Sequence, residues 1–180
     1  MNILQGVIQS VTEPPHPLHV GQAFVVWALY IGVAESRVIC QLLLNHTSDT
    51  DLKETIEHVI ADVEKPLEHK LKHYLEHHGI GIPPTTGDKP RADEAQIPPG
   101  AKFTDAEIAN LLVVKIEGMV NLCHIGIAQS VRDDIGLLLM EAYQHLALQG
   151  FTIKKTMQQR GWFRTPPLYP FSPKAGANAQ

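Results

Sequence analysis

The chain alternates long proline-poor stretches with short segments rich in helix-stopping residues, and this pattern constrains its fold most. Four stretches are long enough to be helices, at about residues 18–46, 51–78, 104–129 and 133–160, and none has the pattern of a strand. The second stretch has a clean apolar stripe at helical spacing, which comprises Leu52, Ile56, Val59, Val63, Leu67 and Leu71. The sequence therefore predicts an all-α protein built from four helices.

The connections between these stretches differ in length, and the difference predicts how the helices pair. Two connections are tight turns, whereas residues 79–103 contain several Gly and Pro and have the composition of a loop. Helices of this length span ~40 Å, and a loop of about 25 residues can reach ~80 Å. The loop can therefore run the whole length of a bundle. We predict a ferritin-like four-helix bundle, in which two antiparallel helical hairpins are joined by a long crossover.

The predicted bundle occupies most of the chain. It covers residues 18–165, with helix pairs at 18–78 and 104–160 and the crossover at 79–103, after a lead-in at 1–17 and before a C-terminal tail at 166–180.

Three local features refine this outline. Pro66 falls inside the second helix, where it removes a backbone hydrogen bond, so we expect a kink or a short break there. Thr104 and Glu107 have the spacing of a capping box, and Ser130 is expected to cap the fourth helix. The two halves of the chain also resemble each other weakly, with Cys40 and Cys123 at equivalent positions.

Charge and composition exclude several classes of function. The net charge is −4 with His neutral, and no basic stripe marks a nucleic-acid surface. Both cysteines lie in apolar stretches and are typical of reduced core thiols in a cytosolic setting. The N-terminus lacks the pattern of a signal peptide, and the run from Ala23 to Ala34 is shorter than the ~20 residues that span a bilayer. We therefore expect a cytoplasmic protein that is not secreted by a signal peptide and has no membrane span.

Polar groups inside the apolar helices are the candidates for chemistry. Glu141 and His145 stand four apart in an otherwise apolar stretch, so they share one helix face, which we expect to point into the bundle. When each hairpin is folded about its turn, a carboxylate on its first helix comes level with a carboxylate–imidazole pair on its second. Glu35 then lies level with the His58–Asp62 pair, and Glu117 lies level with the Glu141–His145 pair. The candidate metal ligands are Glu35, His58, Asp62, Glu117, His124, Glu141 and His145.

These residues allow two interpretations. Di-iron and di-manganese bundles take one Glu from each of two helices and a Glu-x-x-His motif from each of the others, and such ligands suit Fe or Mn. This chain lacks Glu-x-x-His, because its pairs are spaced by four and one pair is reversed in order. The alternative is a structural polar layer, in which each buried charge is paired with another side chain.

Several segments resemble a known family. "LLLNHTSDTDLKETIEHVI" spans the first turn, "FTDAEIANL" opens the third helix, "SVRDDI" forms the second turn and "GWFRTPP" follows the fourth helix. The chain thereby resembles the ferritin-like, coat F-like proteins of endospore-forming bacteria. The resemblance implies a ferritin-like four-helix fold and an association with spore-coat proteins. It brings no established catalytic residues.

Two functions follow as hypotheses. The first is a structural or interaction bundle associated with spores, which forms a homodimer or a larger homo-oligomer because its first and fourth helices are apolar over more of their circumference than one core needs. The second is a di-metal oxidoreductase or a metal-binding protein that uses the bundle interior.

Overall fold

The computed structural model describes residues 16–166, and within them every regular element is helical. The elements are α2 (Val20–Leu44), α3 (Thr50–His58), the π-helix η1 (Val59–Glu64), α4 (Lys65–His77), the short 3₁₀ helix η2 (Glu94–Gln96), α5 (Asp105–Gln129) and α6 (Asp133–Arg160). Because α3, η1 and α4 follow each other without interruption, they form one long helical rod. The described chain therefore contains the four long helical rods that the sequence predicts.

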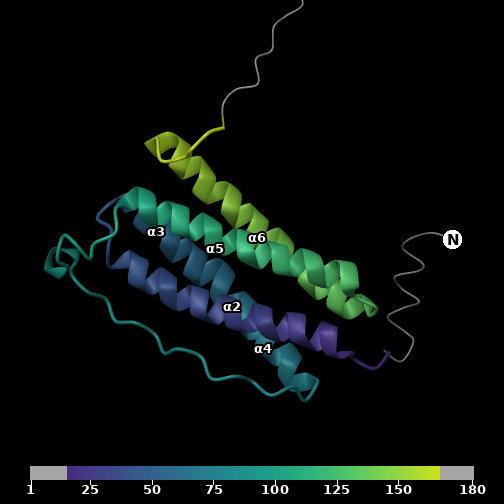
Figure 1. The fold of residues 1–180 in the computed structure, drawn as a ribbon. Helices are drawn as coiled ribbons and strands as arrows, with labels where there is room; N and C mark the ends of the chain where they lie inside the picture. The colour runs from purple at the N-terminus through teal and green to yellow at the C-terminus, as the bar shows by residue number, and fades with distance from the viewer. Residues whose placement is uncertain (1–15, 167–180) are drawn as a thin grey trace, which may run out of the picture.

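The four rods form a bundle of two antiparallel hairpins (Figure 1). The first hairpin pairs α2 with the α3–η1–α4 rod, and the second pairs α5 with α6. In addition, α2 packs against α5, and α6 packs against α3 and η1, so each rod has two neighbours around a shared core. This arrangement confirms the predicted all-α bundle with a long crossover between its hairpins.

Of the two helix caps expected from the sequence, one forms and the other does not, and a further cap is present at α3. Asp49 caps α3 by accepting a hydrogen bond from the Leu52 backbone N–H at 2.9 Å. Thr104 and Glu107 form the expected capping box at the start of α5. The expected cap at Ser130 is wrong, since its hydroxyl donates to the Gly126 carbonyl at 2.7 Å, and Arg132 holds the N-cap position of α6.

The break expected near Pro66 takes the form of the π-helix η1. Pro66 sits in the first turn of α4, where its missing N–H is tolerated. The six residues before Lys65 make wider turns, in which each N–H bonds five residues back. This widening turns adjacent residues inward together, so Val63 and Glu64 are both buried. The π-helix thus places a carboxylate in the core.

The long crossover runs beside α2 and is fixed to it by polar contacts (Figure 1). Backbone N–H groups along the crossover donate to side-chain oxygens of α2 and of Asn45, its C-cap residue. The pairs are Thr86 to Glu35 at 2.9 Å, Lys89 to Gln41 at 2.8 Å and Ala92 to Asn45 at 3.0 Å. Asn45 also donates to the Pro90 carbonyl at 3.0 Å. The side chains of α2 therefore satisfy backbone groups that would otherwise need water.

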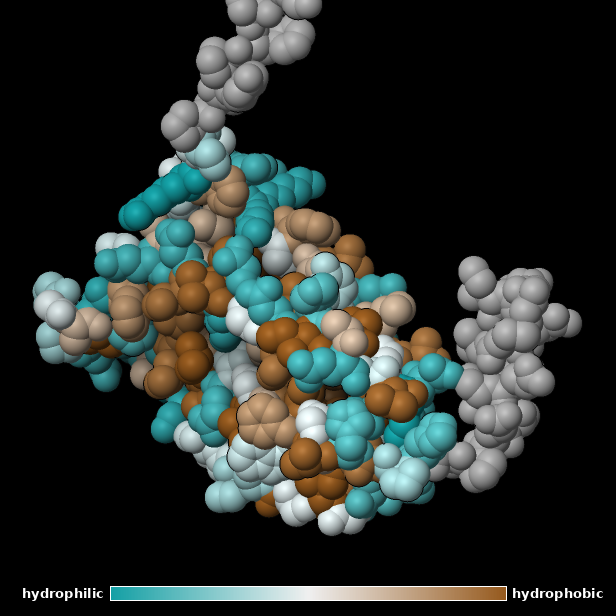
Figure 2. Space-filling model, turned by 45° about the vertical axis from the view of Figure 1, so that its right-hand side comes forward, coloured by the Kyte–Doolittle hydropathy of each residue, from teal (hydrophilic) through white to brown (hydrophobic). Residues whose placement is uncertain are grey.

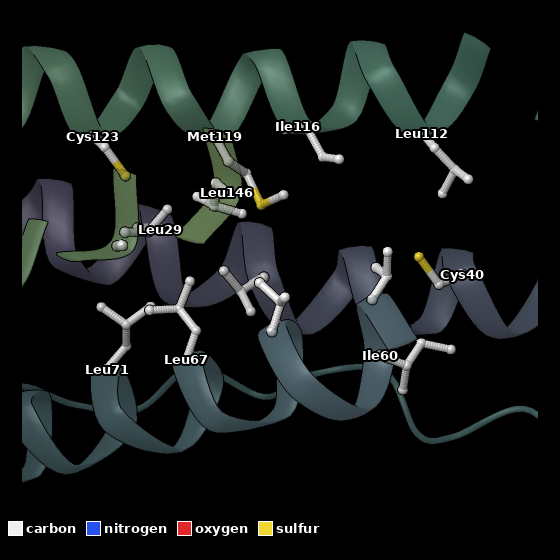
Figure 3. Close-up of a cluster of buried hydrophobic side chains, with 14 of the residues drawn as sticks. Leu29, Cys40, Ile60, Leu67, Leu71, Leu112, Ile116, Met119, Cys123 and Leu146 are labelled. Atoms are coloured by element: carbon white, nitrogen blue, oxygen red, sulfur yellow. The ribbon is translucent and has the colours of Figure 1, made fainter. Parts of the chain in front are cut away.

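The core is a continuous apolar cluster along the bundle axis, and Figure 3 shows part of it, with Leu29, Leu71, Ile116 and Leu146 converging from different rods. The three helices α2, α5 and α6 pack closely together at Gly126. A Cβ atom at Gly126 would lie 2.5 Å from both Leu139 Cδ1 and Val25 Cγ1. Glycine is therefore required at this position for the three helices to approach.

Candidate functional site

The prediction that Glu141 and His145 point into the bundle is wrong, because both residues are exposed. Glu141 forms a surface ion pair with Lys70 of α4. The inward stripe of α6 is narrow and apolar, and it runs through Leu138, Ala142 and Leu146. The Glu141–His145 face lies beside this stripe, on the side that meets solvent.

The other candidate ligands also lie at or near the surface rather than together. His58 and Asp62 pair with each other at 2.6 Å on an exposed face. Glu117 pairs with Lys154 at 3.2 Å, His124 is exposed, and Glu35 holds the crossover through Thr86. Within residues 16–166, no three His, Cys, Asp or Glu side chains are grouped so that they could hold a metal ion. The seven predicted residues therefore do not assemble a centre for Fe or Mn.

The carboxylate at the centre of the bundle is Glu64, which is 0% exposed. The hydroxyl of Ser36 on α2 donates to Glu64 Oε1. Lys115 of α5 donates to the same oxygen at 2.9 Å, and its side chain is 13% exposed. A carboxylate on the α3–η1–α4 rod is thus neutralised by an ammonium group on the opposite hairpin, as a buried charge requires.

Cys40 of α2 completes this cluster. Lys115 Nζ lies 2.8 Å from Cys40 Sγ, and the Cys40 thiol lies 3.8 Å from Glu64 Oε1. Burial raises the pKa of Cys40 to about 12, so the sulfur is a neutral thiol at neutral pH. For Lys115, burial acts to lower the pKa, but the nearby Cys40 and Glu64 outweigh burial and raise it. The amine is therefore a protonated ammonium ion paired with Glu64.

Two buried polar groups at this level have no protein partner in the part of the chain that the structure describes. These are the second carboxylate oxygen of Glu64 and the side-chain amide of Gln149 on α6. A Cβ on Gly150 would lie 3.5 Å from Ile116, which places Gln149 level with Lys115. All four rods therefore contribute a polar side chain to one layer near the middle of the bundle. We call Ser36, Cys40, Glu64, Lys115 and Gln149 the buried polar layer.

A second ionic cluster lies beside this layer, towards the crossover. Arg37 is buried, and its Nε donates to Glu68 at 2.7 Å. Its guanidinium group also pairs with Asp88 of the crossover, which accepts a further hydrogen bond from Gln41 at 3.1 Å. Arg37 therefore links both rods of the first hairpin to the crossover.

Sequence reasoning missed Glu64 and Lys115, although each interrupts an apolar pattern. Glu64 lies four residues after Ile60 and three before Leu67, both of which are buried. Lys115 follows the apolar run "LLVV" of α5. Both residues could have been found by searching for a charged residue that has apolar stripe residues three or four positions before it and after it.

The outer faces of α5 and α6 carry exposed apolar residues, and Figure 2 shows hydrophobic residues gathered in several patches on one face of the molecule. On α6 these residues are Leu137, Met140, Tyr143, Leu148 and Phe151. On α5, six exposed positions have the three-and-four spacing of a coiled-coil seam, and none is charged. We call these six the α5 stripe: Leu111, Val114, Gly118, Asn121, Ile125 and Ala128.

Two helices, α2 and α5, are long and apolar enough to cross a membrane, by length and composition only. The uninterrupted apolar run from Ala23 to Ala34, on which the expectation of no membrane span was based, is too short to do so. Core helices of globular proteins meet the same criterion. In α2, 56% of the most apolar segment is buried inside the structure, whereas in α5 only 28% of the corresponding segment is buried. The bundle core therefore accounts for the composition of α2 better than for that of α5.

The fold and the site together define an all-helical bundle of two hairpins with a buried ion pair between them. The chain belongs to the family described as "Protein of unknown function (DUF3231)", whose model matches residues 7–174. It is similar to the uncharacterized protein YvdQ of Bacillus subtilis (strain 168), with 28% identity over 94% of this chain and 96% of that protein.

Solved structures extend the comparison. The crystal structure of "a putative spore coat protein (BH2358)" from Bacillus halodurans C-125 is similar, with a TM-score of 0.81 and 29% identity over 89% of this chain and 98% of that one. A conserved hypothetical protein of Mycobacterium tuberculosis, rv2844, has a TM-score of 0.63 at 8% identity, over 78% of this chain and 99% of that one. The second likeness concerns the fold alone.

Proposed function

We propose that this protein is a structural bundle of the spore coat type, which assembles with copies of itself through the α5 stripe. The observation that carries the proposal is the stripe itself: it is exposed, uncharged and regularly spaced along a helix whose apolar segment is largely unburied. The similar protein from Bacillus halodurans supports the spore association.

A second copy of the chain suits the α5 stripe better than an unrelated partner would. In a two-fold symmetric dimer, the same surface faces itself, so an uncharged stripe meets no buried charge. Gly118 lies at the middle of the stripe, and nothing lies within 4 Å of the place where its Cβ would be. Two α5 helices can therefore approach closely at this point, and the knobs of one can enter the holes of the other.

The buried polar layer supports a structural role for the bundle interior. Ferritin-like bundles hold metal ions with ligands that project inward from all four helices. We infer a ferritin-like layout for this bundle on the strength of its long crossover and its mid-height polar layer. Here the positive charge beside Glu64 is the ammonium group of Lys115, at 2.9 Å. The layer is thus an ion pair that fixes the two hairpins in register.

The α5 stripe can be tested by measuring mass in solution. We expect light scattering to give a dimer for the wild type at micromolar concentration, and a monomer for Val114→Glu, because Val114 is 66% exposed and is the stripe residue next to Gly118. Val20→Glu is the matched control, since Val20 is an exposed valine on α2, outside the stripe. Circular dichroism should show equal helix content in all three proteins.

Two results would overturn the proposal of self-assembly. One is a wild type that stays monomeric as the concentration rises, and the other is an equal effect of Val20→Glu. Binding to lipid vesicles by a monomeric wild type would assign α5 to a membrane instead. The spore association has its own test: a tagged copy expressed in a sporulating host should be recovered in the coat fraction and not in the soluble fraction.

A further inference from the structure

Lys115 and Cys40 bring an amine and a thiol into contact inside the bundle. Their Nζ and Sγ atoms are 2.8 Å apart, although the residues lie on opposite hairpins. Cys40 is fully buried, and its sulfur points from α2 towards α5 (Figure 3). Pairs of reacting atoms held at about 3 Å react far faster than the same groups free in solution.

Glu64 adds a proton acceptor to this pair. Its Oε1 atom lies 2.9 Å from Lys115 Nζ and 3.8 Å from Cys40 Sγ. Its Oε2 atom is buried and has no protein partner within residues 16–166, so one oxygen of the carboxylate is free to take a proton. The cluster therefore contains an ammonium group that becomes a nucleophilic amine once it loses a proton, a thiol sulfur, and a carboxylate within hydrogen-bond distance of both.

We propose that Cys40 and Lys115 form a peroxide-responsive pair, which closes a sulfenamide cross-link between α2 and α5. Glu64 Oε1, 3.8 Å from the sulfur, takes the thiol proton as the sulfur attacks a peroxide oxygen. The O–O bond breaks, the departing hydroxide takes that proton from Glu64, and Cys40 becomes a sulfenic acid with release of one water. Lys115 then passes a proton to Glu64, its nitrogen attacks the sulfur, the S–O bond breaks and a second water leaves. Overall, the thiol, the ammonium group and one hydrogen peroxide give an S–N bond, two waters and one proton, so that sulfur is oxidised and peroxide is reduced.

The position of the two residues on opposite hairpins determines what the new bond would do to the bundle. The new bond would join the two hairpins covalently. The bundle would then resist separation of α2 from α5 under oxidising conditions.

Cys123 provides a control within the same chain. It is fully buried, like Cys40, and burial raises its pKa to about 12 as well. Within the described residues, however, no lysine or carboxylate forms a hydrogen bond with its sulfur. A difference in behaviour between the two cysteines must therefore come from Lys115 and Glu64, and not from burial.

The test is peptide mapping of the full chain by mass spectrometry after treatment with excess hydrogen peroxide. We expect the intact mass to fall by about 2 Da, because two hydrogens are lost, and chymotryptic peptides with Cys40 and Lys115 to be joined. A thiol reductant should reverse both changes. Cys123 should remain a free thiol in the same sample.

Variants separate the cross-link from ordinary oxidation. Cys40→Ser and Lys115→Arg should abolish the joined peptide, whereas Cys123→Ser should leave it unchanged. The proposal is overturned if Cys40 gains oxygen without joining Lys115, if Cys40 stays a thiol after peroxide treatment, or if Cys123 is cross-linked equally. Should Lys115→Arg fail to fold, the wild-type peptide map decides the matter alone.

Discussion

Glu64 has no contact with solvent, so its carboxylate depends on Lys115 for a counter-charge. A buried carboxylate that loses its counter-charge keeps the full cost of leaving water, whereas an exposed carboxylate is solvated again. Glu64 is 0% exposed, while Glu117, which pairs with Lys154, is largely accessible. The two ion pairs of α5 should therefore respond very differently to removal of the lysine.

We predict that Lys115→Met lowers the free energy of unfolding by about 3–5 kcal/mol. Lys154→Met should lower it by less than about 1 kcal/mol, since that pair is solvent-screened. Chemical denaturation followed by circular dichroism measures both. Adding Glu64→Gln to Lys115→Met should recover part of the loss, and no recovery would show that Glu64 is not the group left unpaired.

Among the elements, the packing of α5 is set by Gly126. A methyl group there would overlap Val25 of α2 and Leu139 of α6, each 2.5 Å away. Both neighbours are core residues without free space, so α5 would have to move. The effect would reach two helices at once.

Gly126→Ala should therefore destabilise the protein by about 1–3 kcal/mol, despite the higher helix propensity of alanine. Gly136→Ala on α6 is the control, because its nearest contact would be Ser130 Cβ at an ordinary 3.7 Å. Thermal unfolding should give a lower Tm for the first variant and an equal or higher Tm for the second. Equal shifts in the two would contradict the packing argument.

The ends of the helices can be predicted from the sequence better than the directions in which their faces point. Pro, Gly and cap residues mark helix ends locally, so the four rods, the Thr104–Glu107 box and a break near Pro66 all follow from short segments. The inward direction of each helix depends on its partners instead. The π-helix η1 turns Glu64 inward, while α6 leaves Glu141 and His145 outside. For this reason the side chains predicted to point inward, Glu141 and His145, lie at the surface, and the buried charges are Glu64 and Lys115 instead.

At the scale of the whole molecule, the crossover is part of the bundle and not a free loop. Asn45 holds it at two points, by accepting from the Ala92 N–H and donating to the Pro90 carbonyl, each at 3.0 Å. Arg91 between them pairs with Glu57 of α3 at 2.5 Å. The crossover is thus anchored to both rods of the first hairpin.

Asn45→Ala should release this part of the crossover without unfolding the helices. Two hydrogen bonds are lost, each contributing about 0.5–1.5 kcal/mol, so trypsin should cleave after Arg91 roughly tenfold faster. Gln144→Ala, on the exposed face of α6, should leave the rate unchanged. An unaltered cleavage rate in Asn45→Ala would mean that other contacts hold the segment.

The linkage of the two hairpins through Lys115 also has a consequence for the order of folding. Lys115 lies 51 residues from Glu64 and 75 from Cys40 along the chain, whereas the contacts within each hairpin close across short turns. Long loops close late, so each hairpin should form before the ion pair joins them. Interactions formed after the transition state act on the unfolding rate. In stopped-flow experiments Lys115→Met should therefore accelerate unfolding and hardly slow refolding. This one lysine would then set the unfolding rate, and with it the lifetime of the folded bundle.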